Sequence, residues 1–433
     1  MLQLSLLKRI KMKEIFKRII TDFIERELKG IKPREINIPL DTTKIVSLIG
    51  IRRSGKTYIL YDLINQLRDT VARENIIYIN FEDDRLFGVS LKDLDDLLNG
   101  YFELYPTKRD EKIYLFLDEI QEVNEWEKFI RRVYDTLNVQ IFITGSSSKL
   151  LSREIATSLR GRTISFEVFP LSFKEYLAFK DVEVNLYSSR SLSFIQHHFN
   201  TYLVEGGFIE VVLEEDPTIK RKILQDYLDL IIYRDLIERY GVKNLTLLKF
   251  MIKYLFSNPA TLFSFNKFYN ELKSSGFKLS KDTLIEYYGY LEDAYTLFRV
   301  PIFRNSIKEE MRNPVKSYII DNGFYSLYDS SISPNYSKLF ENLVYLHLRR
   351  RYKDVHYCKI KQETDFYANG NLINVSYEID LAHTLDREVN SLLESMAYFQ
   401  QNKAVLITNN HEEIIHIEDR TIEIVPLYKW LLE

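Results

Sequence analysis

Short, continuous runs of apolar residues recur along the first third of the chain and alternate with longer segments of mixed polarity. The runs are KIVSLIG (44–50), NIIYIN (75–80), KIYLFL (112–117) and VQIFITG (139–145). Continuous runs of this length predict parallel strands covered on both faces, because a strand with one face in water would alternate in polarity. After the first run, apolar residues from Ile59 to Leu67 recur at helical spacing. The pattern therefore predicts an α/β fold built on a parallel sheet.

The segment GIRRSGKTY (50–58) joins the first predicted strand to this helix. It matches the pattern G-x-x-x-x-G-K-[ST] in the strand–helix context that a phosphate-binding P-loop requires. Glycines let successive backbone N–H groups approach phosphates, and the helix N-terminus adds a favourable dipole. We expect Lys56 to reach the β and γ phosphates of ATP and the Thr57 hydroxyl to ligate Mg²⁺. The residues predicted to bind the nucleotide are Gly50, Arg52, Arg53, Ser54, Gly55, Lys56, Thr57 and Tyr58.

Two acids follow the apolar run at 112–117, at the strand end where ligands bind in open α/β sheets. We expect Asp118 to hold the Mg²⁺ ion together with Thr57. Glu119 is the predicted general base that polarises the attacking water. Glu82 and Asp83 end another strand at the same predicted edge, and contact with water is the favoured interpretation for both.

The remaining catalytic candidates, beside Lys56 and Glu119, come from two polar loops. Ser146, with Thr144 as second choice, is predicted to sense the γ-phosphate; the alternative is a serine-rich N-cap for the next helix. Arg160 and Arg162 lie in the segment LRGRT, and an arginine can stabilise charge that develops on the γ-phosphate. Arg162 is the preferred candidate, and two solvated arginines are the alternative.

Composition adds exclusions. The single cysteine, Cys358, excludes an intramolecular disulfide, which is typical of a reducing compartment, so a cytoplasmic location is expected. The chain lacks a run of about 18 apolar residues, so no membrane span or membrane partner is expected. With a net charge of −3, nucleic-acid binding would depend on local basic patches.

The ordered motifs GIRRSGKT, YINFEDDRL, LFLDEIQEV, FITGSSSKLL, LRGRT and PLSFKEYL resemble those of archaeal and bacterial AAA-like P-loop ATPases, a family near the signal-transduction ATPases with numerous domains. The resemblance implies a P-loop NTPase parallel sheet with an additional strand between the Walker A and Walker B strands. It also implies a helical lid, a winged helix and a small α/β domain resembling restriction endonucleases. The expected boundaries are a basic N-terminal helical segment at 1–40, the ATPase core at 41–169, the lid at 170–241, the winged helix at 242–330 and the nuclease-like domain at 331–433.

Within the winged-helix region, a helix preceded by Ser280 as N-cap is the expected recognition helix. A hairpin around a basic tip with Lys308 and Arg312 would form the wing. Lys278 and Lys281 suit DNA, whereas nearby acids oppose it, so contact with DNA and contact with protein both stay open.

The nuclease-like tail departs from the pattern that it resembles. Glu341 and Asp365 fit the first two acidic positions, but Asn374-Val375-Ser376 stands where E-x-K is expected. The loss of a carboxylate and a lysine predicts a catalytically degenerate domain.

Three functions follow in order of preference. The first is a Mg²⁺-dependent ATPase that couples ATP binding and hydrolysis to a conformational change, acting on or with double-stranded DNA. The second is a nucleotide-gated switch or scaffold that acts on protein partners or through self-association. The third, a metal-dependent nuclease, is disfavoured by Asn374 and Ser376.

Overall fold

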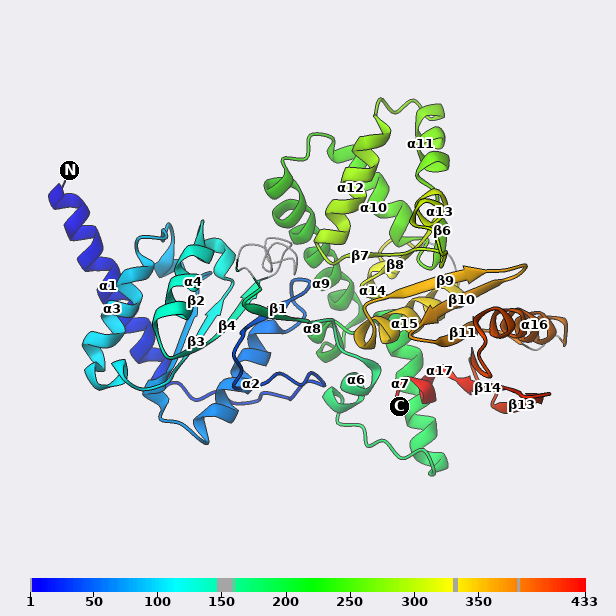
Figure 1. Cartoon of the computed structure of the whole chain (residues 1–433), viewed down its shortest axis with the longest axis horizontal. Coiled ribbons are helices and arrows are strands. Elements are labelled where there is room, and N and C mark those ends of the chain that lie inside the picture. Colours follow the sequence, from blue (N-terminus) through cyan, green and yellow to red (C-terminus); the bar gives the residue numbers. More distant parts are fainter. Residues whose placement is uncertain (1, 146–158, 160, 330–333, 380–381) are drawn as a thin grey trace. The chain divides into compact units, whose positions relative to one another are not determined.

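The computed structural model describes residues 2–145, 159, 161–329, 334–379 and 382–433. The chain divides into two compact units, residues 1–168 and 169–433, and each has its own core. Figure 1 shows both, and each is described by itself below.

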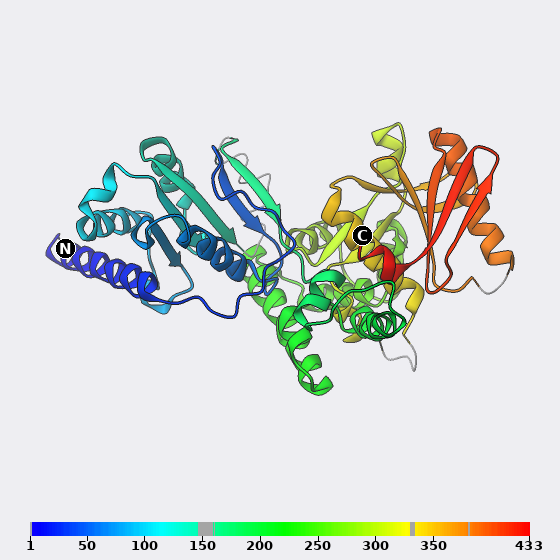
Figure 2. The ribbon, with the colours of Figure 1, turned by 90° about the horizontal axis from the view of Figure 1, so that it is seen from below.

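The described strands of the first unit form a five-stranded sheet in the order β2-β3-β4-β1-β5 (Figures 1 and 2). All four strand pairs are parallel. The strands are β1 (Ile45–Ile49), β2 (Ile76–Asn80), β3 (Ile113–Asp118), β4 (Val139–Gly145) and β5 (Thr163–Glu167). Because β4 lies between β1 and β3, the predicted P-loop NTPase sheet with an additional strand is confirmed.

Helices cover this sheet. The described helices are α1 (Leu2–Glu25), α2 (Lys56–Arg68), α3 (Leu94–Leu104) and α4 (Trp126–Thr136), with short 3-10 helices η1 (Arg73–Asn75), η2 (Asp84–Leu86), η3 (Pro106–Arg109) and η4 (Ile120–Glu122). Every residue of β1 and β3 is buried, which explains why these strands are apolar apart from Ser47 and Asp118. Helix α1 packs on α3 and β2, and its Phe16 and Phe23 are buried, so the basic N-terminal helix contributes to the core of this unit.

The second unit contains two further sheets. Strands β6 (Thr261–Phe263), β8 (Val315–Ile319) and β7 (Leu297–Val300) form a three-stranded antiparallel sheet in that order. The other sheet has the order β13-β14-β12-β11-β10-β9 and mixes parallel and antiparallel pairs. Its strands are β9 (Val355–Lys359), β10 (Glu363–Ala368), β11 (Asn371–Ser376), β12 (Lys403–Thr408), β13 (Glu413–Ile417) and β14 (Arg420–Pro426).

The helices of this unit confirm the predicted succession of a helical region and a further α/β region. Its described helices are α6 (Phe173–Phe179), α7 (Ser189–Glu205), α8 (Ile209–Leu213), α9 (Pro217–Leu230), the π-helix η6 (Ile231–Glu238), α10 (Leu245–Phe256), α11 (Phe265–Ser274), α12 (Lys281–Asp293), α13 (Ile307–Arg312), α14 (Gly323–Ser326), α15 (Tyr336–Arg351), α16 (Ala382–Phe399) and α17 (Leu427–Trp430). Ser280 caps α12 by accepting a hydrogen bond from the Thr283 amide at 3.1 Å, as predicted. Strands β7 and β8 pair as expected for the wing, but Lys308 and Arg312 lie on helix α13 between them and not at a hairpin tip.

A buried aspartate links two turns of this unit. Asp321 accepts hydrogen bonds from the amides of Gly207 at 2.7 Å and Gly323 at 2.8 Å. Gly206 has a φ of +81°, and a Cβ there would lie 1.7 Å from Asp321 Oδ1. Glycine is therefore required at 206 because a carboxylate occupies the space of a side chain, and at 207 because a Cβ would lie 2.4 Å from the Leu171 carbonyl oxygen.

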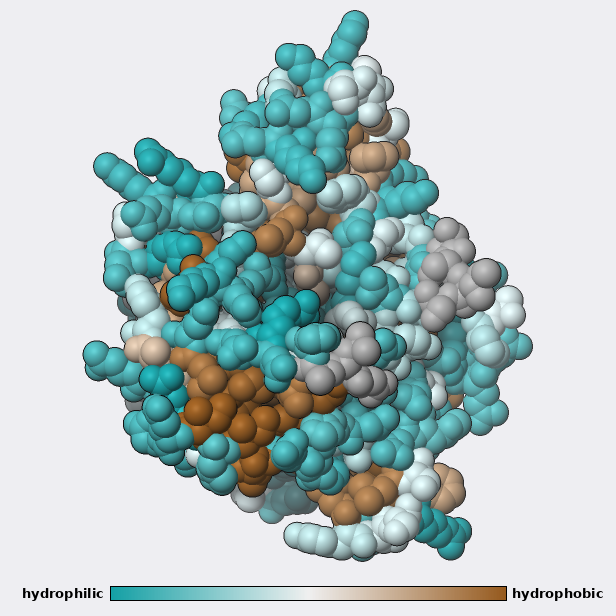
Figure 3. All heavy atoms as spheres, turned by 90° about the vertical axis from the view of Figure 1, so that its right-hand side faces the viewer, coloured by the Kyte–Doolittle hydropathy of each residue, from teal (hydrophilic) through white to brown (hydrophobic). Residues whose placement is uncertain are grey.

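The surface shown in Figure 3 is mostly hydrophilic, with one larger hydrophobic area. Among the residues that the structure describes, no helix combines the length and the apolar character needed to cross a membrane.

Candidate nucleotide-binding site

The P-loop connects the carboxyl end of β1 to the start of α2, and its backbone explains its glycines. Gly50 has a φ of +152°, and a Cβ there would lie 2.1 Å from the carbonyl oxygen of Val168. Gly55 caps α2 with a φ of +93°. Arg53 also has a left-handed φ of +65°, which is costly for a residue with a side chain. The loop thus curls tightly, and its shape is maintained by local contacts.

Those contacts centre on Lys56. Its ammonium donates hydrogen bonds to the carbonyl oxygens of Gly50 and Ile51, at 3.0 Å each, and the residue is buried. The Ser54 hydroxyl donates to the same Ile51 carbonyl at 2.8 Å. Arg34, from the segment before β1, donates to the Ser54 carbonyl at 2.8 Å. A buried cation at a helix N-terminus is the arrangement that neutralises a phosphate.

Asp118 at the end of β3 faces the same loop. Its Oδ2 accepts hydrogen bonds from the Thr57 hydroxyl at 2.7 Å and the Tyr78 hydroxyl at 2.9 Å, and its Oδ1 accepts one from the Thr144 hydroxyl. Burial raises the pKa of Asp118, whereas the hydrogen bonds from Thr144, Thr57 and Tyr78 act in the opposite direction. The structure therefore brings together Thr57 and Asp118, the two residues predicted to hold the metal.

These donors suit Mg²⁺, which prefers hard oxygen ligands and is commonly held by one or two protein groups together with phosphates and water. The described residues contain no group of three or more His, Cys, Asp or Glu side chains that could hold a metal ion. A cation at Thr57 and Asp118 would thus depend on a nucleotide for its remaining ligands.

Glu119 follows directly and has a left-handed φ of +53°. Its amide donates to the Thr144 hydroxyl at 3.0 Å, and its carboxylate accepts a hydrogen bond from the Gln121 side chain. This backbone conformation is costly for a residue with a side chain, and strain of this kind clusters at functional sites. The predicted base is buried next to the predicted metal ligands.

The other residues predicted for the site differ in whether they contact the cluster of Lys56, Thr57, Asp118 and Glu119. Arg52 forms an ion pair of 3.1 Å with Glu82, so Glu82 contacts the P-loop. The side chain of Tyr58 is 58% exposed on α2, where it meets the Tyr61 ring edge-on. Ser146 lies outside the residues that the structure describes, whereas Thr144, the second choice, contacts both Asp118 and Glu119.

Arg162 lies away from the P-loop of its own chain. It precedes β5, and its carbonyl accepts a hydrogen bond from the amide of Ile45 at the start of β1. Its guanidinium pairs with Asp135 at 3.1 and 3.2 Å. The P-loop leaves the other end of β1, five residues or about 16 Å away. Arg162 therefore lies at the amino ends of the strands, whereas the P-loop lies at their carboxyl ends. It does not contact a nucleotide on its own P-loop.

The structure adds residues to the site that the sequence did not indicate: Arg34, Tyr78 and Gln121. Tyr78 pairs in register with Phe116, two residues before Asp118, so its side chain is on the same face of the sheet as the carboxylate. That relation depends on strand order and register, which no local motif encodes.

Comparison with known proteins agrees with this architecture. A family model for an AAA domain matches residues 42–177, and a model for a domain of unknown function matches residues 196–332. The uncharacterized protein MJ1544 of Methanocaldococcus jannaschii is 39% identical, over 98% of this chain and 96% of its own length. The chain belongs to the archaeal and bacterial AAA-like P-loop ATPase family. An uncharacterized protein of Haemophilus influenzae is 33% identical to this AAA-like protein, over 91% of this chain and 95% of its own.

Among solved structures, the Walker-type ATPase of Pyrococcus abyssi matches the AAA-like protein with 15% identity and a TM-score of 0.42. The match covers 66% of this chain and 90% of that chain.

The AAA-like protein also gathers three acids of its second unit around a lysine of β8. Lys316 of β8 is buried and contacts Glu341 and Glu363 at 2.9 Å and Asp365 at 2.8 Å. Burial lowers the pKa of Lys316, but Asp365 and Glu341 outweigh it and hold that pKa well above its usual range. Burial raises the pKa of Glu341 to about 7 although Lys316 opposes the shift. An ammonium group thus sits among the carboxylates.

Asn374, one of the two departures from E-x-K, has a structural role in this region. Its side chain accepts a hydrogen bond from the Asp365 amide at 3.1 Å and donates one to Glu388 at 2.8 Å. Asp365 accepts a further hydrogen bond from the Val375 amide at 2.9 Å. Asp365 and Asn374 are therefore linked to each other and to neighbouring backbone.

Proposed function

We propose that the first unit binds ATP with Mg²⁺ and hydrolyses it, and that the released energy drives a conformational change in the chain. The observation that carries this proposal is the convergence of Lys56, Thr57, Asp118 and Glu119 where β1 and β3 end. The hydrogen bond of 2.7 Å between Thr57 and Asp118 joins the two motifs directly. If the glycine-rich segment were only a turn, a hydrogen bond between it and the end of another strand would not be expected.

Each residue of the site has a defined task in this proposal. The amides of residues 50–57 and the Lys56 ammonium bind the phosphates. Thr57 and Asp118 hold Mg²⁺, which neutralises charge on the phosphates when it is bound. Glu119 orients a water molecule and accepts its proton, while Gln121 keeps the Glu119 carboxylate in place. Thr144 links Asp118 to Glu119, so it takes the sensing task that was predicted for Ser146.

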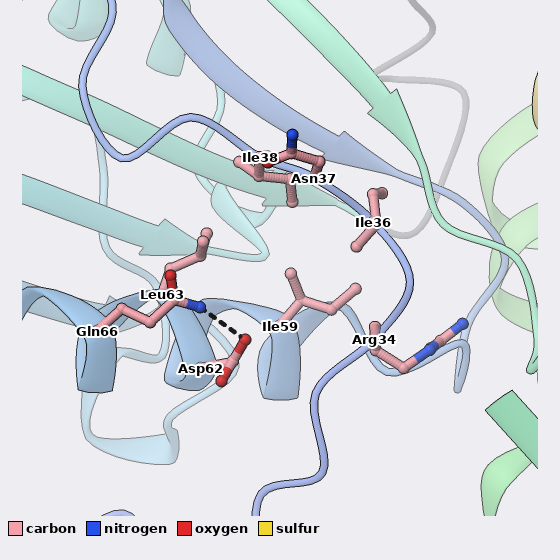
Figure 4. A pocket seen from close by; sticks show the side chains of 8 residues that line it. All are labelled: Arg34, Ile36, Asn37, Ile38, Ile59, Asp62, Leu63 and Gln66. Atoms are coloured by element: carbon pink, nitrogen blue, oxygen red, sulfur yellow. Dashed lines mark hydrogen bonds between the residues drawn. The ribbon is translucent and has the colours of Figure 1, made fainter. Parts of the chain in front are cut away.

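The nucleobase has a candidate pocket beside the P-loop. A cavity of about 80 Å³ lies between the segment at 34–38 and α2, and Figure 4 shows the side chains that line it. Ile36 and Ile59 supply apolar surface for a flat ring, and Asp62, whose Oδ2 accepts a hydrogen bond from Gln66 at 2.9 Å, can accept one from an exocyclic amine at its other oxygen. Arg34 lines the cavity and also contacts the loop through Ser54, which connects base and phosphate binding.

For the output of the cycle we propose double-stranded DNA as the first candidate. Helices α11 and α12 with the β7–β8 pair are the candidate winged helix, and α12 begins with the exposed Lys281. A second candidate, a nucleotide-gated switch that acts on proteins, is favoured by the exposed acids Asp282 and Glu286 on the same helix. These acids would repel phosphates at the helix start.

The test is ATP turnover by the full chain, with Lys56→Ala and Glu119→Gln as site variants. We expect each to reduce turnover at least about 100-fold, because charge stabilisation and base catalysis each contribute at this scale. Lys44→Ala and Glu122→Gln are matched controls: they make the same chemical changes at exposed positions, Lys44 at the other end of β1 and Glu122 in η4. Turnover that survives in the site variants would reject the proposed chemistry.

Repeating the assay with double-stranded DNA at low and moderate salt separates the two outputs. Stimulation by DNA that weakens with salt supports the DNA candidate, because phosphate contacts are strongly screened. Turnover that is independent of DNA at both salt concentrations supports the protein-directed switch.

A further inference from the structure

The hydroxyl of Tyr78 is the feature of the nucleotide site that its motifs do not explain. Tyr78 lies in β2, which carries neither the P-loop nor the acidic motif, yet it donates a hydrogen bond of 2.9 Å to Asp118 Oδ2. With Thr57 on the same oxygen and Thr144 on Oδ1, the carboxylate receives three side-chain hydroxyl donors. Thr57 comes from the P-loop, whereas Tyr78 and Thr144 come from the strands on either side of β3.

The ring of Tyr78 is fixed from several sides, so the direction of its hydroxyl is fixed too. Phe23 of α1 stacks on it with ring centroids 4.4 Å apart, and the Tyr61 ring lies 5.3 Å away. Tyr78 is 5% exposed, so its ring has no open space to turn into. Helix α1 thereby supports a contact of the nucleotide site through one aromatic pair.

The hydrogen bonding at this hydroxyl has a defined order. The Tyr61 hydroxyl donates to the Tyr78 hydroxyl at 3.3 Å, and the Tyr78 hydroxyl donates onward to Asp118. Burial and the neighbouring Asp118 raise the pKa of Tyr78, which keeps it a neutral donor. The carboxylate is thus held at both oxygens by the sheet, independently of Thr57.

We propose that Tyr78 is a positioning residue that sets the orientation of the Asp118 carboxylate for the metal–nucleotide complex. This inference rests on the proposed function, because it assigns a role to Asp118 that only a bound metal–nucleotide complex would use. The Thr57 hydroxyl can then turn from Asp118 toward the metal. The Asp118 carboxylate keeps its orientation, because Tyr78 and Thr144 still donate hydrogen bonds to it.

The experiment compares Tyr78→Phe with Tyr61→Phe in the full chain. Tyr78→Phe keeps the ring on Phe23 and removes only the donor to Asp118. We expect the Mg²⁺ concentration for half-maximal strengthening of nucleotide binding to rise about 5- to 10-fold, and kcat to fall about 10-fold with KM for ATP nearly unchanged. Tyr61→Phe removes a hydroxyl that is one hydrogen bond further from Asp118. In this variant the half-maximal Mg²⁺ concentration and kcat should each change less than about twofold.

Two readouts separate this role from a merely structural one and from failure of the proposed function. Nucleotide binding in EDTA should match wild type in both variants, because packing is retained, and the thermal midpoint of Tyr78→Phe should fall by only a few degrees, since one donor to a buried carboxylate is lost. A Tyr78→Phe variant with wild-type Mg²⁺ dependence would overturn the inference. If wild type lacks turnover, the proposed hydrolysis fails, but Mg²⁺-dependent binding of a fluorescent ATP analogue still decides the role of Tyr78.

Discussion

Buried polar residues of the nucleotide site are held by partners from more than one strand or helix. Thr144 shows this most directly, since its hydroxyl donates to Asp118 and accepts from the amide of Glu119. The two acids after β3 are therefore fixed relative to each other by a residue of β4. Removal of one such group leaves the others unsatisfied in a buried environment, which costs more than the lost hydrogen bond itself.

A prediction at this scale concerns Arg162, which pairs with Asp135 at the amino edge of the sheet. Because this position is at the far edge from the P-loop, we expect Arg162→Ala to change the turnover of dilute protein less than about twofold. Turnover measured across protein concentrations provides the check. A loss of more than tenfold, together with activity that rises with concentration in wild type, would instead place Arg162 at the nucleotide of a second copy.

Sequence reasoning succeeded where the signal is contiguous. The P-loop and the acids after β3 were identified because a strand, a turn and the functional residues follow one another within a few positions. It did not place Arg162, which lies away from the P-loop of its own chain and pairs with Asp135. A residue that precedes a parallel strand lies at the amino edge of the sheet, whereas ligands bind at the carboxyl edge.

The contacts of Tyr78 and Lys316 could not be predicted from a single sequence. The contact of Tyr78 with Asp118 depends on the register of β2 on β3. Lys316 contacts Glu341, Glu363 and Asp365 from a different sheet. Glu341 is 25 residues and Asp365 is 49 residues away from Lys316 along the chain. Tertiary packing decides such contacts, and periodicity carries no information on them.

At the scale of secondary-structure elements, Asp321 predicts a pH dependence of the second unit. Burial raises the pKa of Asp321 to about 7 from its ordinary value of 3.8, although the amides of Gly207 and Gly323 and the charge of Arg350 oppose the shift. A folded-state pKa above the unfolded one means that ionisation disfavours folding. The stability from this residue is thus complete below about pH 4 and is lost as the pH rises through about 7.

We expect the free energy of unfolding of wild type to lose about 2 kcal/mol between pH 5 and 8 through Asp321, and Asp321→Asn to lack this component. The variant has a lower stability at every pH, because an amide cannot accept from both glycine amides, but its profile is shallower. Denaturant unfolding at several pH values measures the slopes. Parallel profiles for the two proteins would contradict the assignment.

For the whole molecule, two units with separate cores predict two unfolding transitions. A ligand that binds only the folded first unit stabilises it by RT ln(1 + [L]/Kd), about 2.7 kcal/mol at 100 times Kd, and leaves the second unit unchanged. Lys316→Met acts on the second unit alone, because it leaves three carboxylates around a buried site without their cation. Breaking a buried ion pair in this way costs about 3 to 5 kcal/mol.

Differential scanning calorimetry of the full chain, with and without ATP and Mg²⁺, separates these effects. Nucleotide should raise one transition in wild type and in Lys316→Met, and should raise neither in Lys56→Ala. Lys316→Met should lower the other transition, whereas Lys429→Met, which removes a more exposed partner of Glu412 in the same unit, should shift it little. One transition that responds to both nucleotide and Lys316→Met would mean that the two units unfold together, and that ATP binding stabilises the second unit as well as the first.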